Sequence, residues 1–125
     1  MRAAQFAAVL GLTLPCAVHP QGGDPQRGAA LYEARCGGCH SLDANRIGPL
    51  HQGVFGRRAG SVADYGYSDA LRASIIVWNE HTLDAWLRDP QALIPGQKMG
   101  YALQSAAERA DIIAWLRQSQ SHRSK

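Results

Sequence analysis

The segment Cys36-Gly37-Gly38-Cys39-His40 carries the clearest chemical signal in this 125-residue chain. A C-x-x-C-H sequence is the attachment signature of c-type haem. Two thiols three positions apart, at the end of a helix, can reach the two vinyl groups on one side of a porphyrin, and the histidine that follows can bind the iron. The two glycines offer little steric resistance to the tight turn. The segment therefore predicts one covalently attached haem c with its iron.

Three other kinds of site also use closely spaced cysteines. A disulfide redox centre has a C-x-x-C sequence, but it is expected in a βαβ context, which this sequence lacks. A structural zinc site needs a fourth ligand and usually a second pair of ligands, whereas no cysteine follows Cys39 and the other histidines are scattered. A structural disulfide would close a loop too short to stabilise the fold much. Haem attachment is the favoured interpretation, and these three remain the alternatives.

Length and composition favour a single globular domain. The chain is 46% hydrophobic and 18% charged, which argues against a disordered chain or a coiled coil. Lys and Arg number 13 against 10 Asp and Glu, and this net charge of +3 is too mild to predict a nucleic-acid surface. Three cysteines are too few for a disulfide-rich scaffold.

The N-terminal residues have the features of a secretory signal peptide. Arg2 precedes about twelve mostly apolar residues, and Pro15 then interrupts the run. The run is too short for a membrane-spanning helix, which needs about 20 residues. We expect a signal peptide over residues 1–20, a folded domain over residues 21–125, and export to the periplasm. If Cys16 leaves with the signal peptide, the mature chain has two cysteines. A buried N-terminal helix is the alternative.

Helix-capping signals predict about four short helices and no strands. Each expected helix starts after a capping side chain, and the last start has the pattern of a capping box, with Glu108 three positions after Ser105. Pro90 ends the third helix, because proline disfavours helical geometry in the residue before it. Residues 41–66 show no regular period and predict a glycine-rich loop, which in a compact domain needs something inside to hold it. The expected fold is all-α, with helices near residues 25–35, 69–73, 80–89 and from 106 onwards, capped by Asp24, Ser68, Asn79 and Ser105.

Met99 is the predicted second ligand of the iron. It is the only methionine beyond the first residue, and it lies in a loop, residues 95–101, where no helical period gives it a packing role. A thioether ligand favours the ferrous state and raises the reduction potential relative to two histidines. A gap-filling core methionine is the alternative. The rival ligands are the remaining histidines, His19, His51, His81 and His122, and the plainest interpretation of His51 is a structural or surface residue.

Taken together, the motifs of this chain resemble class I cytochrome c, in the mitochondrial-like form of bacterial exported monohaem proteins. The resemblance runs from about Gly28 to Leu116, nearly the whole expected mature chain. This ordered series of motifs is much more specific than one C-x-x-C-H sequence. Besides residues 36–40, the matching segments are residues 48–50, 54–60, 65–68, Trp78, 82–83, Pro90, 95–99 and 112–116.

The resemblance implies a cytochrome c fold, in which short helices and glycine-rich loops surround one covalently bound haem. It also implies roles for the matched residues. Cys36 and Cys39 would form the thioethers, and His40 and Met99 would bind the iron. The carbonyl of Pro49 would accept the other ring proton of His40, a bond that fixes the tautomer and orientation of a metal ligand.

Three further matched positions imply a site for a haem propionate. Arg57, Tyr67 and Trp78 stand where the family uses hydrogen bonds or charge to hold this carboxylate, which needs such support when buried. Core packing for Trp78 and a solvated surface charge for Arg57 are the alternatives. Gly28 and Tyr32 match a close contact between the first and last helices.

Several positions depart from the family pattern. Trp86 replaces a tyrosine that commonly donates a hydrogen bond to the methionine sulfur, and Leu71 stands where many relatives carry a polar residue. Gly100 follows Met99 directly and could loosen its loop. The chain has only two lysines, so the lysine ring that mitochondrial relatives use for docking is absent.

The resemblance implies an electron carrier rather than an enzyme. The expected protein is a soluble, monomeric cytochrome of a respiratory chain that passes single electrons between periplasmic or membrane redox partners. These partners are a quinol-oxidising complex, a terminal oxidase or a periplasmic dehydrogenase, with no nucleic acid and with membrane contact only through partners or an uncleaved signal. Two alternatives remain: a peroxidase or gas sensor with a labile methionine site, and a dedicated electron-transfer subunit of a larger dehydrogenase or oxidase.

Overall fold

The structure, a computed structural model, describes residues 22–120. The expected signal peptide with its boundary, together with Cys16, His19 and His122, lies outside these residues. No helix within the described part is both long and apolar enough to cross a membrane.

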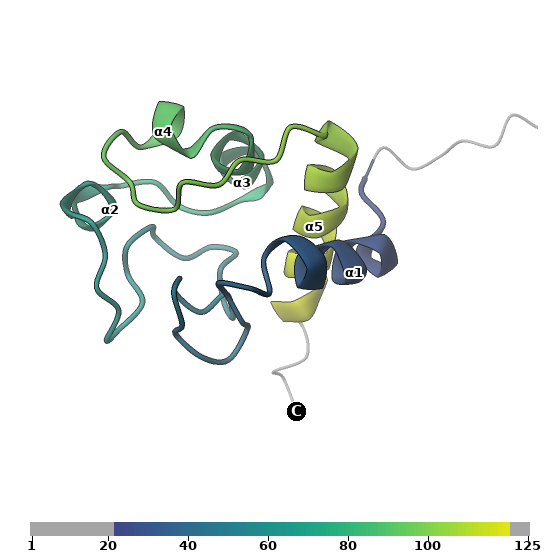
Figure 1. The fold of residues 1–125 in the computed structure, drawn as a ribbon, viewed down its shortest axis with the longest axis horizontal. Coiled ribbons are helices and arrows are strands. Elements are labelled where there is room, and N and C mark those ends of the chain that lie inside the picture. The colour runs from purple at the N-terminus through teal and green to yellow at the C-terminus, as the bar shows by residue number, and fades with distance from the viewer. Residues whose placement is uncertain (1–21, 121–125) are drawn as a thin grey trace, which may run out of the picture.

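Within residues 22–120, five helices are arranged around long connecting loops (Figure 1). Four of them confirm the helices that the capping signals predict, and the short α4 is additional. Asp89 ends α3 and also starts α4, because its side chain accepts a hydrogen bond from the Ala92 amide at 3.0 Å. Pro90 favours the end of α3, because proline disfavours helical geometry in the residue before it. It also favours the start of α4, because proline suits the first position of a helix. The helices are α1 (Pro25–Arg35), α2 (Asp69–Ala73), α3 (Glu80–Arg88), α4 (Pro90–Leu93) and α5 (Ala106–Ser119).

The predicted capping box at the start of α5 is only half formed. The Ser105 side chain accepts from the Glu108 amide at 3.2 Å, but the Glu108 carboxylate binds Arg35 of α1 at 3.2 Å instead of returning to the cap. A complete capping box occurs at the start of α3, where Asn79 and Thr82 bond each other's backbone amides at 2.8 and 2.9 Å. An arginine from another helix thus competes successfully for the glutamate.

Residues 41–66 contain no helix, as predicted, and long-range backbone bonds hold the end of this loop region. One isolated antiparallel bridge joins Arg58 to Val77. Next to it, the Gly56 amide donates to the Trp78 carbonyl at 2.8 Å, and the Trp78 amide donates to the Arg57 carbonyl at 2.9 Å. These bonds bring Arg57 and Trp78, which are far apart in sequence, to the same wall of the molecule.

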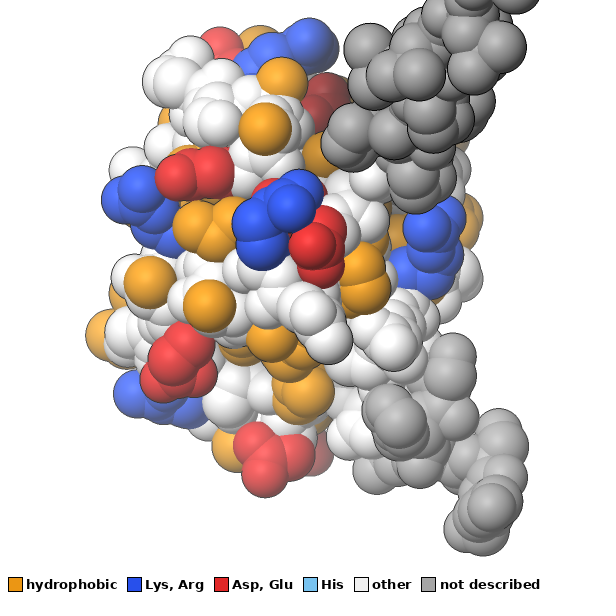
Figure 2. All heavy atoms as spheres, turned by 90° about the vertical axis from the view of Figure 1, so that its right-hand side faces the viewer, with side chains coloured by type: hydrophobic (Ala, Val, Ile, Leu, Met, Phe, Trp, Pro, Cys, Tyr) orange, Lys and Arg blue, Asp and Glu red, His pale blue; other side chains and the backbone are white. Residues whose placement is uncertain are grey.

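α1 and α5 cross closely on one side of the molecule (Figure 1). A Cβ atom on Gly28 would lie 2.0 Å from the Asp111 carbonyl oxygen, so only glycine permits this approach. The rings of Tyr32 and Trp115 are 4.3 Å apart. The predicted contact between the first and last helices is therefore present. Figure 2 shows this side, on which acidic, basic and apolar side chains are interspersed.

A buried carboxylate ties the same two helices together. Asp111 of α5 is only 5% exposed, and it accepts hydrogen bonds from the Asp24 amide at 2.6 Å and from Arg27 Nε at 2.9 Å. The hydrogen bond from Arg27 lowers the pKa of Asp111. Asp111 therefore adds a charged contact to the N-terminal end of α1, where the helix dipole favours negative charge.

Candidate functional site

One cavity of about 400 Å³ collects the chemically important residues of the chain. This volume lies within the range of small-molecule sites, about 300–1,000 Å³. Apolar side chains from α2, α3 and α5, such as Leu71, Leu83 and Ile112, form much of its wall. All eight residues that the sequence predicts for the site line this cavity: Cys36, Cys39, His40, Pro49, Arg57, Tyr67, Trp78 and Met99.

The C-terminal end of α1 shapes the C-x-x-C-H segment into a tight turn. The amides of Cys36 and Gly37 both donate to the Tyr32 carbonyl, at 2.8 and 2.9 Å, and the His40 amide donates to the Cys36 carbonyl at 2.8 Å. Cys36 is half-buried and Cys39 is exposed, and both are free thiols. The turn thus presents two thiols and the imidazole to the same cavity.

The alternative sites for these cysteines fit the structure poorly. Redox-active cysteines have thiol pKa values below the ordinary range, whereas burial raises the pKa of Cys36 to about 11. For zinc, no cluster of three or more His, Cys, Asp or Glu side chains suited to a metal ion occurs between residues 22 and 120. The geometry favours a group that reacts with both thiols and takes its metal ligand from His40.

His40 is held in the form that a metal ligand requires. Its Nδ1 lies 2.8 Å from the Pro49 carbonyl oxygen, and because a carbonyl only accepts, Nδ1 carries the proton and Nε2 keeps a free lone pair. Burial lowers the pKa of His40, which favours the neutral ring. A Cβ on Gly48 would lie 2.1 Å from His40 Cε1, so this glycine leaves the space that the ring occupies.

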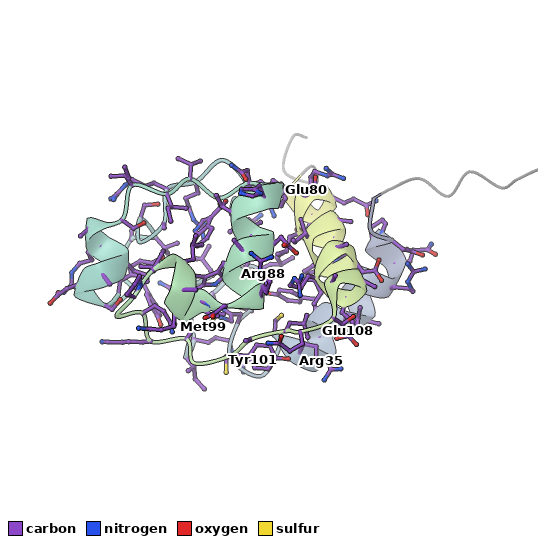
Figure 3. All side chains as sticks on the ribbon, turned by 90° about the horizontal axis from the view of Figure 1, so that it is seen from above. Arg35, Glu80, Arg88, Met99, Tyr101 and Glu108 are labelled. Carbon is purple, nitrogen blue, oxygen red and sulfur yellow. The ribbon has the colours of Figure 1, made fainter. Side chains whose placement is uncertain are left out.

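Met99 lies half-buried on the loop after α4 and lines the same cavity as His40. Figure 3 shows Met99 and Tyr101 on this loop, with Arg35 and Glu108 beside Tyr101. Gly100 has φ +58, a left-handed conformation that favours glycine, so the residue after Met99 shapes the loop. Of the rival histidines within the described part, His81 is exposed at the start of α3, and His51 lies against His40 itself.

Arg57 offers a place in the cavity for an acidic group of a ligand. Its guanidinium donates to the carbonyls of Gln52 at 2.6 Å and Leu50 at 2.9 Å, and burial lowers its pKa. No carboxylate between residues 22 and 120 forms an ion pair with it. Tyr67 is also buried, and its hydroxyl oxygen accepts from the Val62 amide at 3.3 Å, which leaves the hydroxyl proton available. A half-buried cation without a protein counter-ion suits a ligand that carries a carboxylate.

These residues fit haem c by their chemistry. The cavity offers two thiols, a neutral imidazole, a thioether and a cation within apolar walls. The substituted positions Leu71 and Trp86 also line it, and the Trp86 ring lies 5.4 Å from the Trp78 ring.

The contacts of two residues beside His40 were not predicted from the sequence. His51 is packed face to face on His40, with ring centroids 4.1 Å apart, and burial lowers its pKa to about 3. Arg46 Nη1 donates to the Gly37 carbonyl at 2.6 Å and lies 3.4 Å from the His40 carbonyl, so it braces the C-x-x-C-H turn. The position of His51, two residues after Pro49, was the only sequence signal for its contact with His40, and nothing in the sequence marks Arg46.

Comparison with known proteins identifies the family of this chain. A model of the cytochrome c family matches residues 25–120. The chain belongs to the cytochrome c family. Among its relatives, the cytochrome c of Gibberella zeae is 43% identical over 102 residues, which cover 78% of this chain and 96% of that protein. The cytochrome c of Arabidopsis thaliana is 44% identical over 98 residues, covering 75% of this chain and 88% of that protein.

A solved structure confirms the cytochrome c fold. Cytochrome cH from Methylobacterium extorquens superimposes with a TM-score of 0.73 at 38% identity, covering 77% of this chain and 99% of that chain. The family assignment confirms the predicted cofactor, a covalently attached haem c that contains iron. It also places this cytochrome c among electron carriers that act with redox partners, a family whose members are generally not enzymes.

Proposed function

We propose that this cytochrome c carries single electrons between periplasmic or membrane redox partners, with His40 and Met99 as the two protein ligands of the iron. The observation that carries the proposal is that Cys36, Cys39, His40 and Met99 all line one largely apolar cavity. When bound, haem c supplies an iron that alternates between the ferric and ferrous states, which is the one-electron chemistry of the family.

The residues of this chain set the conditions for that chemistry. The Pro49 carbonyl keeps the proton on His40 Nδ1, so that Nε2 would be the atom that binds the iron. The thioether of Met99 would raise the reduction potential relative to a second histidine. With His40 and Met99 both bound, the iron would have no open position for a substrate.

Arg57, Tyr67 and Trp78 are proposed to receive a propionate. The Arg57 guanidinium supplies positive charge, and Tyr67 supplies a hydroxyl proton that no other contact uses within the described residues. A carboxylate placed there would pair with the half-buried guanidinium, and this avoids the cost of burying an unpaired charge.

The proposed location and partners rest on the sequence. Arg2 and the apolar run that follows it fit export to the periplasm. A solved bacterial relative, cytochrome cH, is consistent with a bacterial context. A quinol-oxidising complex, a terminal oxidase and a periplasmic dehydrogenase are the partner classes proposed, and a transient interface is expected because redox encounters bury little surface.

Substitution of Met99 tests the proposed ligand set. We expect Met99→Ala to lower the reduction potential and to let the ferrous protein bind carbon monoxide. Met99→His should also lower the potential, yet it should keep the iron closed, because imidazole replaces the lost ligand. Ala102→Ser, an exposed position on the same loop, is the control and should change neither property. An unchanged potential in Met99→Ala would refute Met99 as a ligand.

A further inference from the structure

The proposed iron ligand His40 is packed against a second histidine. The rings of His40 and His51 are stacked, with centroids 4.1 Å apart and planes inclined by only 19°. His51 lines the same cavity as His40. No role is assigned to His51 in holding the cofactor, so its close packing on His40 needs an explanation.

Two other contacts act on the His40 ring. The 2.8 Å bond from Nδ1 to the Pro49 carbonyl holds one ring atom. Gly48 packs against the ring near Cε1, where an added Cβ would come within 2.1 Å of Cε1 and 2.5 Å of both ring nitrogens. The hydrogen bond alone does not prevent the ring from tilting about the line from Nδ1 to the carbonyl oxygen. A second aromatic ring in van der Waals contact with the face of His40 opposes this tilt directly.

His51 is itself held from α1. Tyr32 Oη and His51 Nδ1 share a hydrogen bond of 2.9 Å, and their rings meet edge to face with centroids 5.7 Å apart. Tyr32 is only 4% exposed, and its ring packs on Trp115 of α5 at 4.3 Å. The position of His51 is therefore set by the crossing of α1 and α5, where Gly28 allows the two backbones to approach closely.

We propose that His51 and Tyr32 are positioning residues that fix the plane of the His40 imidazole, with Tyr32 anchoring His51 and His51 covering one face of His40. The inference rests on the proposed role of His40 as an iron ligand. It adds that the orientation of this ligand, and through it the electronic state of the iron, depends on the packing between α1 and α5.

Three variants separate this role from a structural one. His51→Leu removes the aromatic face and keeps an apolar side chain. Tyr32→Phe keeps the ring on Trp115 and removes only the hydroxyl that holds His51. Tyr65→Phe is the matched control, because it also removes one tyrosine hydroxyl bond, the 2.6 Å bond to the Ile47 carbonyl, at a residue of the cavity wall.

The ferric holoprotein of each variant is measured by electron paramagnetic resonance and by proton NMR, since the g values and the spread of the hyperfine-shifted haem methyl signals report the plane of the axial imidazole. The reduction potential is measured in parallel. We expect the g values and methyl spread to shift most in His51→Leu, less in Tyr32→Phe and least in Tyr65→Phe, at the same haem content per chain.

The outcomes are distinguishable. If the unmodified protein shows no axial histidine, the proposed function fails before the variants are considered. If it shows the axial histidine, but His51→Leu and Tyr32→Phe change the g values no more than Tyr65→Phe does, the positioning role is overturned. A loss of stability with unchanged g values has the same meaning, because it reveals a structural role only.

Discussion

Adding one methyl group at Gly48 should dislodge the imidazole of His40. The new Cβ would lie 2.1 Å from Cε1 and 2.5 Å from each ring nitrogen, whereas ordinary contact begins at 3.4 Å. The ring would have to retreat by about 1.3 Å, the difference between 2.1 and 3.4 Å. Gly48 cannot easily move in its place, because its amide is bonded to the Cys39 carbonyl at 2.9 Å.

The cost of this displacement follows from two contributions. A shift of that size breaks the 2.8 Å bond between His40 and Pro49, worth about 0.5–1.5 kcal/mol, and overpacking of a buried site costs about 1–3 kcal/mol. We expect Gly48→Ala to lower the free energy of unfolding of the holoprotein by about 2–4 kcal/mol. It should also weaken the absorption bands of low-spin iron.

Urea unfolding, followed by tryptophan fluorescence and by the Soret band, measures the first effect. A loss of that size moves the midpoint by about 1–2 M for a protein of this length. Gly22→Ala is the control, because Gly22 is exposed and a Cβ there would meet no atom within 4 Å. A Gly48→Ala protein with the midpoint and spectrum of Gly22→Ala would refute the claim that Gly48 makes room for the His40 ring.

Two further predictions concern the contact between α1 and α5. Gly28→Ala should lower the free energy of unfolding by at least about 2 kcal/mol. The added Cβ would lie 2.0 Å from the Asp111 carbonyl oxygen, and this clash outweighs the better helix propensity of alanine. An unchanged urea midpoint would contradict the close crossing of α1 and α5. Asp111→Asn should cost about 1–2 kcal/mol near neutral pH. The pKa of Asp111 is lower in the folded protein than in the unfolded chain. The stabilisation by its charge is therefore present above about pH 4 and fades as the pH falls through the folded pKa. The acid unfolding curves of the unmodified protein and of Asp111→Asn should therefore converge at low pH. Parallel acid curves would exclude a charged Asp111 contact.

Local signals account for the parts of the fold that the sequence predicted well. Asp24, Ser68 and Asn79 each satisfy amides within three residues of themselves, so their caps depend little on the rest of the chain. The C-x-x-C-H turn is equally local, since its bonds run between Tyr32 and His40. Such features can be recognised without knowing what surrounds them.

The missed features depend on contacts between distant residues. Glu108 leaves its predicted capping box because Arg35, 73 positions earlier, binds its carboxylate. His51 becomes a partner of His40 only because Tyr32, 19 positions away, holds it by a hydrogen bond. The gathering of Arg57 and Trp78 at one wall was predicted from family resemblance alone, because composition and spacing give no sign of the bridge beside them.

The most direct test of the central claim is the visible absorption spectrum of the purified holoprotein, oxidised and reduced, with and without carbon monoxide. If His40 and Met99 both bind the iron, the reduced protein shows a sharp c-type spectrum that carbon monoxide leaves unchanged. A shift on adding carbon monoxide would contradict the account, because it would reveal an open or labile ligand position and would favour a peroxidase or gas sensor over an electron carrier.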